Sequence, residues 1–219
     1  MPTNSYHMPH LKVCGMADAD SLQAVAALHP DFLGFIFYPQ SKRYVGERLP
    51  AAAVRALPAA IRKVGVFVDD DAATVLARVQ EFDLQLAQLH GHETPETCAA
   101  VRAGGVPVMK AFAVGEGFDF AQLQPYVGSV DYFLFDTAGP QPGGNGTAFD
   151  WTLLANYELP VPYFLAGGIG PEHAAALRNL RLPGLFALDL NSKFETAPGT
   201  KDADRLAQFF TDIRPAPQG

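Results

Sequence analysis

Cys14 is the first residue of this chain with the chemistry of a catalytic group. It ends the short apolar run that begins at Leu11, and Gly15 follows it as a turn residue. If the run is a strand, the thiol lies at the carboxyl end of that strand, the rim where α/β barrels carry out their reactions. An inert buried thiol is the alternative, because free cysteine is among the residue types most often buried.

The same arrangement, polar residues directly after an apolar run, recurs along the chain. His90-Gly91 and Asp136-Thr137 each follow such a run, and a longer loop after residues 32–37 contains Lys42 and Arg43. Residues 69–71 are three aspartates after another run, and a helix cap explains them most simply. If the runs are parallel strands of one barrel, their polar residues share one rim and can form a site.

Two successive loops have the composition of a phosphate site. Gly167-Gly168 brings backbone without side chains to the rim just before Pro171, a favourable first helical residue. One strand later comes Asp189, followed by Asn191-Ser192. Loops after strands seven and eight of these barrels bind phosphate through backbone N–H groups. The predicted phosphate-binding residues are therefore Gly167, Gly168, Asn191 and Ser192, and an ordinary glycine turn is the alternative.

Eight apolar segments of strand length alternate with eight segments of helical spacing. The expected strands are residues 11–14, 32–37, 63–68, 84–89, 107–112, 132–135, 162–166 and 185–190. The expected helices are residues 21–28, 51–57, 72–81, 95–103, 120–126, 151–157, 171–180 and 202–213. This alternation predicts a single-domain (β/α)8 TIM barrel with parallel strands. An open doubly wound sheet is the competitor, but it would be expected to carry a glycine-rich loop after its first strand.

Composition narrows the function classes. The chain has 219 residues, 48% of them hydrophobic and 18% charged, and a net charge of −7, which argues against nucleic acid as a partner. Two cysteines indicate a reducing compartment. Since no apolar stretch is long enough to span a bilayer, we expect a cytoplasmic protein without a membrane partner. Residues 1–10 are expected to be a loose extension, residues 11–214 the barrel, and residues 215–219 a tail.

The chain resembles the phosphoribosylanthranilate isomerase family of tryptophan biosynthesis from residue 11 to residue 210. The matching segments are Lys12-Val13-Cys14-Gly15, Gly34-Phe35-Ile36-Phe37-Tyr38-Pro39 with Ser41 and Arg43, Val64-Gly65-Val66-Phe67-Val68, Gln88-Leu89-His90-Gly91, Phe135-Asp136-Thr137, Phe149-Asp150-Trp151, Leu165-Ala166-Gly167-Gly168, Asp189 with Ser192 and Glu195, and Pro198-Gly199 with Lys201-Asp202. The chain departs from the family pattern at Ala17, Lys42, Asn145, Thr147 and Lys193-Phe194. These departures affect the loop 143–147 and the phosphate pocket.

The resemblance implies an Amadori rearrangement of N-(5′-phosphoribosyl)anthranilate to the 1-deoxyribulose 5-phosphate isomer. It implies that Asp136 is the general acid and Cys14 the general base. A thiol titrates closer to neutrality than a carboxylate, and its surroundings can lower its pKa. The apolar run before Asp136 could raise the pKa of that carboxyl, whereas a turn-forming aspartate is the alternative. The proton relocation involves no redox change, so no cofactor is expected.

The resemblance also implies substrate-binding roles. Arg43 would bind the anthranilate carboxylate, a contact that suits its planar fork, although loop arginines are usually solvated. His90 would lie near the substrate at the rim, and Asp189 would face its hydroxyl groups or have a structural role. His90 and His92 could suggest a metal, but no third ligand lies nearby in sequence, so none is expected. The expected partner is a phosphorylated sugar–anthranilate substrate, and the chain could be a monomer or a homodimer.

Other functions of a phosphate-binding barrel remain possible from the sequence. Indole-glycerol-phosphate synthase would need a catalytic lysine and glutamate at strand ends, for which Lys110 is a candidate. A pentose-phosphate epimerase would need metal ligands on several strands. A barrel that binds phosphate without catalysis is the third alternative, and the joint presence of Cys14, Asp136 and Arg43 argues against it.

Overall fold

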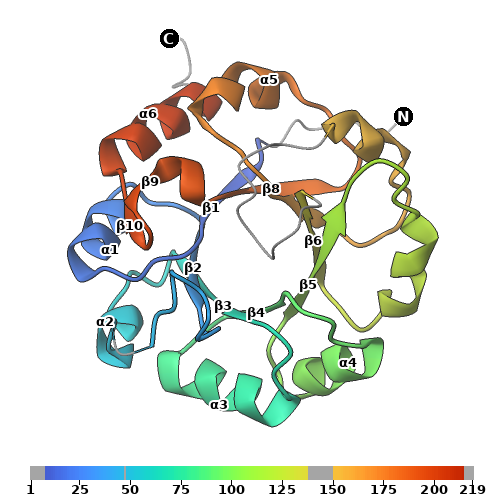
Figure 1. The fold of residues 1–219 in the computed structure, drawn as a ribbon, viewed down its shortest axis with the longest axis horizontal. Helices are drawn as coiled ribbons and strands as arrows, with labels where there is room; N and C mark the ends of the chain where they lie inside the picture. The colour runs from blue at the N-terminus through green and yellow to red at the C-terminus, as the bar shows by residue number, and fades with distance from the viewer. Residues whose placement is uncertain (1–7, 47, 138–149, 215–219) are drawn as a thin grey trace.

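Eight parallel strands close into a barrel (Figure 1). The computed structural model describes residues 8–46, 48–137 and 150–214. The strands are β1 (His10–Val13), β2 (Phe32–Ile36), β3 (Arg62–Phe67), β4 (Leu86–Leu89), β5 (Val108–Val114), β6 (Tyr132–Thr137), β7 (Tyr163–Leu165) and β8 (Leu185–Leu190). Each pairs with the next, and β8 pairs with β1, where Lys12 lies beside Asp189. The predicted TIM barrel is confirmed.

Helical segments form a ring outside the strands (Figure 1). They are α1 (Ala19–Ala26), α2 (Ala51–Arg55), α3 (Ala72–Phe82), α4 (Pro95–Ala103), η1 (Phe120–Tyr126), η2 (Trp151–Asn156), η3 (Pro171–His173), α5 (Ala174–Asn179) and α6 (Ala203–Ile213). The helices expected after the fifth and sixth strands are 3₁₀ segments, η1 and η2. In η1 the reason is Pro125, which lacks the N–H that an α-helix needs.

Aspartate side chains begin most of the longer helices. Asp18 accepts a hydrogen bond from the N–H of Ser21 at the start of α1, and Asp71 does the same for Thr74 at the start of α3. Each bond satisfies one of the N–H groups that a first helical turn leaves unpaired. The interpretation of Asp71 as a helix cap is therefore confirmed.

A short hairpin after β8 was not expected from the sequence. The 3₁₀ segment η4 (Ser192–Phe194) leads into β9 (Glu195–Ala197), which pairs antiparallel with β10 (Thr200–Lys201). Gly199 turns the chain between them with φ of 90°, a backbone conformation that L side chains rarely adopt. The hairpin lies beside α1 (Figure 1). Lys201 donates to the side chain of Asn191, the residue that follows β8, so the hairpin brings Glu195 and Lys201 to the barrel rim.

The hydrophobic core has two parts. The barrel interior is filled by Phe32, Val64, Leu86, Met109, Ala111, Leu134, Phe164, Ala166 and Ala187. A larger cluster lies between the strands and the helical ring. Phe32 and Phe164 meet across the interior with ring centroids 5.2 Å apart in an edge-to-face arrangement. This packed interior is a rigid support for the polar residues at the carboxyl ends of the strands.

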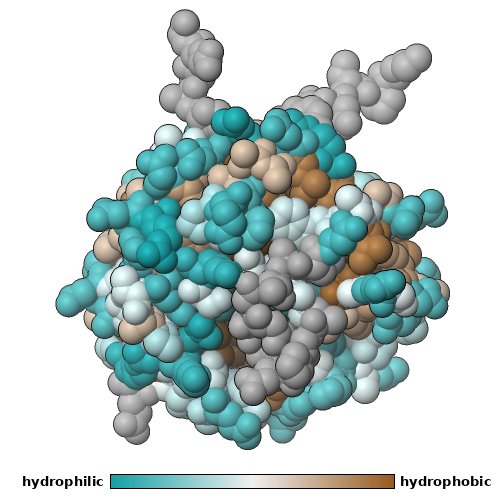
Figure 2. Space-filling model, turned by 45° about the horizontal axis from the view of Figure 1, so that its top comes forward, coloured by the Kyte–Doolittle hydropathy of each residue, from teal (hydrophilic) through white to brown (hydrophobic). Residues whose placement is uncertain are grey.

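The outer surface is mainly polar. On the face shown in Figure 2, hydrophilic side chains surround smaller hydrophobic areas. Among the described residues Met8 is the one large hydrophobic side chain that counts as exposed. No helix within the described ranges has the length and apolar character needed to cross a membrane. The predicted extension and tail, apart from residues 8–10, and the loop 143–147 lie outside the described residues.

Candidate active site

Four polar side chains lie next to the carboxyl ends of their strands. Lys12, Gln88, Asp136 and Asp189 are the penultimate residues of β1, β4, β6 and β8. Lys12 is fully buried, and its ammonium donates to Asp189 Oδ2 at 2.8 Å and to Gln88 Oε1 at 2.9 Å. Burial is the largest influence and would lower the pKa of Lys12, but the negative charges of Asp189 and Cys14, together with the hydrogen bond to Asp189, outweigh it and hold that pKa above its ordinary value.

Lys12 determines the orientation of a short hydrogen-bond chain. Because an ammonium only donates, the Gln88 oxygen faces Lys12 and the Gln88 amide nitrogen is left to donate. That nitrogen lies 2.8 Å from His90 Nδ1, which therefore accepts. The neutral ring must then carry its proton on Nε2, and Nε2 lies 3.7 Å from Asp136 Oδ2. Burial and the charge of Lys110 lower the pKa of His90 to about 4, so this contact is no ion pair at neutral pH.

Asp136 has the protonation behaviour of a general acid. Burial raises the pKa of this carboxyl to about 6, although its Oδ1 accepts a hydrogen bond from the Thr137 N–H at 2.8 Å. The apolar run before Asp136 thus has the predicted effect on its pKa. The strand continues two residues further than expected, to Thr137, so Asp136 lies within β6 rather than after it.

Cys14 lies directly beyond β1 and is buried, with 4% exposure. Its N–H donates to the Leu190 carbonyl at 2.8 Å, which continues the pairing of β1 with β8 by one residue. Burial raises the pKa of the Cys14 thiol, and the nearby charge of Lys12 only partly offsets this. The surroundings of Cys14 therefore raise its pKa rather than lower it, because desolvation of the thiolate outweighs the neighbouring cations.

Arg43 lies in the loop after β2 and is engaged by Glu195 of the hairpin. Its Nε lies 2.8 Å from Oε1 and its Nη2 lies 2.7 Å from Oε2, a two-point contact. Lys201 donates to the same carboxylate at 2.7 Å and to Asn191 Oδ1 at 2.8 Å. Burial would raise the pKa of Glu195, but the hydrogen bond from Arg43 and the charge of Lys201 hold it below its ordinary value.

The two predicted phosphate loops follow β7 and β8. Gly167 and Gly168 have φ of 86° and 66°, so both use backbone conformations that favour glycine. A Cβ on Gly167 would collide with the Thr137 hydroxyl. Within the described residues, no hydrogen bond is donated by the backbone N–H groups of Gly167, Gly168, Asn191 and Ser192. The loops therefore offer unengaged amides near the start of η3 and in η4.

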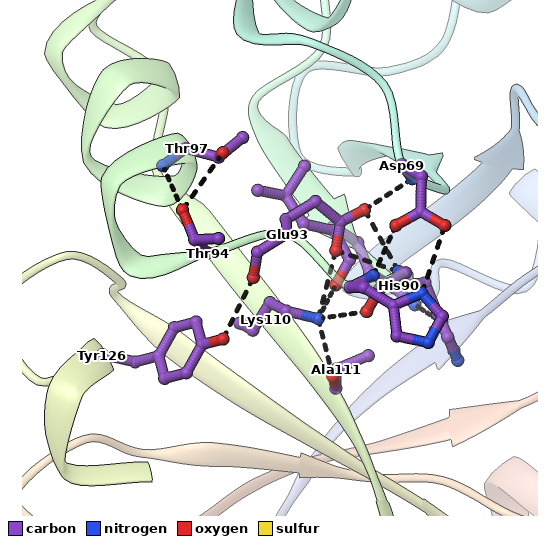
Figure 3. A network of polar contacts seen from close by, with 12 residues as sticks. Asp69, His90, Glu93, Thr94, Thr97, Lys110, Ala111 and Tyr126 are labelled. Atoms are coloured by element: carbon purple, nitrogen blue, oxygen red, sulfur yellow. Dashed lines mark hydrogen bonds and ion pairs between the residues drawn. The ribbon is translucent and has the colours of Figure 1, made fainter. Parts of the chain in front are cut away.

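A second buried ion pair holds the loop after β4 that begins with His90 (Figure 3). Lys110 Nζ lies 3.1 Å from Glu93 Oε2 and donates to the Gly91 carbonyl at 2.8 Å. Glu93 accepts from the N–H of Asp69 at 2.9 Å, which ties this loop to the one after β3. Lys110 is buried, and its ammonium also donates to the Ala111 carbonyl at 3.0 Å, so its hydrogen-bond donors are engaged in holding the loop. This disfavours Lys110 as the catalytic lysine of an indole-glycerol-phosphate synthase.

The whole barrel matches one family model. Residues 11–212 match the model described as N-(5′-phosphoribosyl)anthranilate (PRA) isomerase. The chain is also 43% identical to the N-(5′-phosphoribosyl)anthranilate isomerase of Parabacteroides distasonis over 205 residues, which covers 93% of this chain and 92% of that protein. The chain belongs to the PRA isomerase family.

Solved structures of PRA isomerases have the same architecture. The crystal structure of the enzyme from Thermotoga maritima superimposes with a TM-score of 0.84 at 31% identity and covers 94% of this chain and 98% of its own. A PRA isomerase in complex with reduced 1-(o-carboxyphenylamino)-1-deoxyribulose 5-phosphate gives a TM-score of 0.81 at 29% identity, with the same coverage. The resemblance to the PRA isomerase family inferred from sequence motifs is thus confirmed.

Not all the side chains singled out in the sequence lie in this site. His92 is 97% exposed and lies 3.3 Å from Asp69, whereas His90 is mostly buried beside Gln88, so the two histidines of the His-x-His pair point to different surroundings. Lys42 is exposed beside Arg43. Within the described ranges, no three His, Cys, Asp or Glu residues are grouped as metal ligands.

Sequence reasoning missed the polar residues that support the site. Lys12 and Gln88 entered only as letters of family motifs, although a charged or amide residue inside an apolar strand was a usable signal. Only Val13 lies between Lys12 and Cys14, so strand alternation directs both side chains to the same side. Glu195 and Lys201 could not be paired with Arg43 from sequence, because the unexpected hairpin brings them together.

Proposed function

We propose that the chain catalyses the isomerisation of N-(5′-phosphoribosyl)anthranilate in tryptophan biosynthesis, with Asp136 as general acid and Cys14 as general base. One observation carries this assignment: a carboxyl group with a pKa of about 6 and a buried thiol are both under the influence of the Lys12–Asp189 pair at the carboxyl ends of the strands. Acid–base catalysis of a proton relocation needs one group that gives a proton and one that takes it.

The first step opens the ribose ring. Asp136 gives its proton to the furanose oxygen while the bond between that oxygen and C1′ breaks. The nitrogen lone pair of the anthranilate forms the C1′–N double bond of a Schiff base, and Asp136 is left as a carboxylate. A raised pKa suits this step, because it increases the fraction of the carboxyl that holds a proton near neutral pH.

The second step moves the proton from C2′. The Cys14 thiolate takes this proton, and the electron pair of the C–H bond becomes the C1′–C2′ double bond. The electrons of the C–N double bond return to nitrogen, giving an enolamine that tautomerises to the ketone. Burial disfavours the thiolate, so the fraction of Cys14 that is ionised depends on the cations around it.

The remaining site residues bind the substrate in this proposal. Arg43 receives the anthranilate carboxylate, and its Nη1 has no partner among the described residues. Gly167, Gly168, Asn191 and Ser192 bind the phosphate through their N–H groups. Asp189 Oδ1 is buried without a hydrogen bond from the described residues, and it can accept one from a substrate hydroxyl. His90 points its Nε2–H towards Asp136 and the reacting sugar.

The partner is a small phosphorylated molecule, no cofactor takes part, and the enzyme acts in the cytoplasm. The chain functions as a monomer or a homodimer; one similar structure, 28% identical, is of monomers generated from the dimeric isomerase of Thermotoga maritima. The proposal is tested by incubating purified protein with N-(5′-phosphoribosyl)anthranilate and identifying the product by mass spectrometry and NMR. Enzyme-dependent formation of the ribulose isomer supports it. Tight binding of the substrate without turnover would instead indicate a binding protein.

A further inference from the structure

Burial of the charged Lys12 ammonium costs free energy of folding. The side chain is 0% exposed and lies with Gln88 and Asp189 in a buried polar group next to the apolar barrel interior. A buried charge is strongly destabilising unless it is paired and hydrogen-bonded. Asp189 and Gln88 each accept one of its three N–H groups. A buried methyl or methylene group would fill the same space without this cost, so the charge calls for a functional reason.

The third N–H group of the Lys12 ammonium can be directed towards Cys14. Lys12 and Cys14 are two residues apart on one extended segment, because Cys14 still pairs with Leu190 of β8. Their side chains therefore project to the same side. The positive charge of the ammonium therefore acts on the Cys14 thiol and favours its ionised form.

Four charged groups from four segments influence the Cys14 thiol through their charges. Lys12 on β1 and Lys201 on β10 favour the thiolate, and Asp189 on β8 opposes it. Arg43, from the loop after β2, also interacts with the thiol by charge. Lys201 and Arg43 are both bound to Glu195, whose negative charge reduces their effect.

We propose that Lys12 is a positioning residue of the reaction, whose ammonium favours the proton-accepting anionic form of the Cys14 sulfur against the burial that disfavours it, while Asp189 limits this effect. The inference rests on the proposed function, because it assigns the base role to Cys14. It adds that the Lys12–Asp189 pair has two opposed effects on the thiol.

The test measures the ionisation of the thiol directly. In a Cys98→Ala background Cys14 is the sole cysteine of the chain. The ultraviolet absorbance of its thiolate is titrated against pH, with the corresponding Cys14→Ser protein as blank. Lys12→Met should move the titration upwards by about one pH unit or more and lower kcat/KM about tenfold at neutral pH. Asp189→Asn should move the titration downwards.

A further variant covers the case in which Lys12→Met does not fold because Asp189 is left unpaired. Replacing the pair as a unit, by Lys12→Met with Asp189→Leu, is expected to cost less stability than breaking it. Its thiol titration should still lie above that of the wild type, since Lys12 has the larger effect on Cys14. Circular dichroism checks the fold of each variant.

The two hypotheses fail in different ways. Titrations that stay at the wild-type position, or that move in the same direction in Lys12→Met and Asp189→Asn, would overturn the role of Lys12. Full turnover by Cys14→Ser would overturn the proposed base instead, whatever the titrations show. Opposite shifts in the two variants, with kcat/KM falling in Lys12→Met, are the result expected from the proposal.

Discussion

Arg43 and Glu195 form a two-point ion pair that joins the loop after β2 to the hairpin after β8. Nη2 of Arg43 lies 2.7 Å from Oε2, and the guanidinium retains 19% side-chain exposure. Glu195 is held in turn by Lys201 and by the N–H of Gly199. One edge of the guanidinium is therefore fixed by the protein, which orients the remaining edge for a planar carboxylate.

Arg43→Ala should impair substrate binding more than the proton transfers. Loss of a charge-assisted contact of this kind costs about 2–5 kcal/mol when it is partly buried, so KM should rise tenfold or more. Arg43→Lys should recover only part of the loss, because an ammonium cannot reproduce the planar fork. Steady-state kinetics of both variants provide the measurement. Unchanged KM and kcat in Arg43→Ala would mean that another residue binds the carboxylate, and Lys42 would be tested next.

The pH dependence of kcat/KM should show that the general acid, Asp136, titrates at a lower pH than the general base, Cys14. Asp136 titrates at about 6, and burial raises the pKa of Cys14 above its ordinary value, so the group that must be protonated is the stronger acid. At low pH both groups hold protons and Cys14 cannot act. The rate should rise through about pH 6 as the pair loses its first proton, remain level, and fall only where Cys14 titrates. A rate that falls through pH 6 would contradict these assignments.

Gly167→Ala should weaken phosphate binding. The added Cβ would collide with the Thr137 hydroxyl, and the φ of 86° would be strained for alanine. The inhibition constant of inorganic phosphate should therefore rise several-fold, together with KM. Gly105→Ala is a matched control, since Gly105 has φ of 89° but nothing within 4 Å of an added Cβ. Equal inhibition by phosphate in wild type and Gly167→Ala would remove this loop from the phosphate site.

Lys110→Met should destabilise the barrel, because it leaves the buried Glu93 carboxylate without its cation. Breaking a buried pair costs about 3–5 kcal/mol, measurable by urea denaturation, and Glu93→Gln added to Lys110→Met should recover much of it. Arg78→Met breaks an exposed pair with Glu81 and should cost less than about 1 kcal/mol. If Lys110→Met is as stable as wild type, the Glu93–Lys110 pair does not hold this part of the barrel.

The sequence was sufficient for the barrel and for the positions of Cys14 and Asp136, whereas their proposed roles as base and acid came from the resemblance to the family. Strand alternation and apolar runs locate Cys14 and Asp136 near strand ends, since these patterns depend on local chemistry. The Arg43–Glu195 pair could not be predicted, because it joins residues 152 positions apart through a hairpin without a clear apolar pattern. The raised pKa of Cys14 also depends on packing, which no single stretch of sequence specifies.

The most direct measurement is the turnover of N-(5′-phosphoribosyl)anthranilate by three matched variants, Cys14→Ala, Asp136→Asn and Cys98→Ala. Cys98 is a buried thiol in α4 whose pKa is raised to about 11, so it controls for loss of a cysteine without a catalytic role. All three should fold and bind the reduced product analogue, as checked by circular dichroism and calorimetry. The account predicts loss of turnover in Cys14→Ala and Asp136→Asn and near-normal turnover in Cys98→Ala. Near-normal turnover in Cys14→Ala or Asp136→Asn would contradict it.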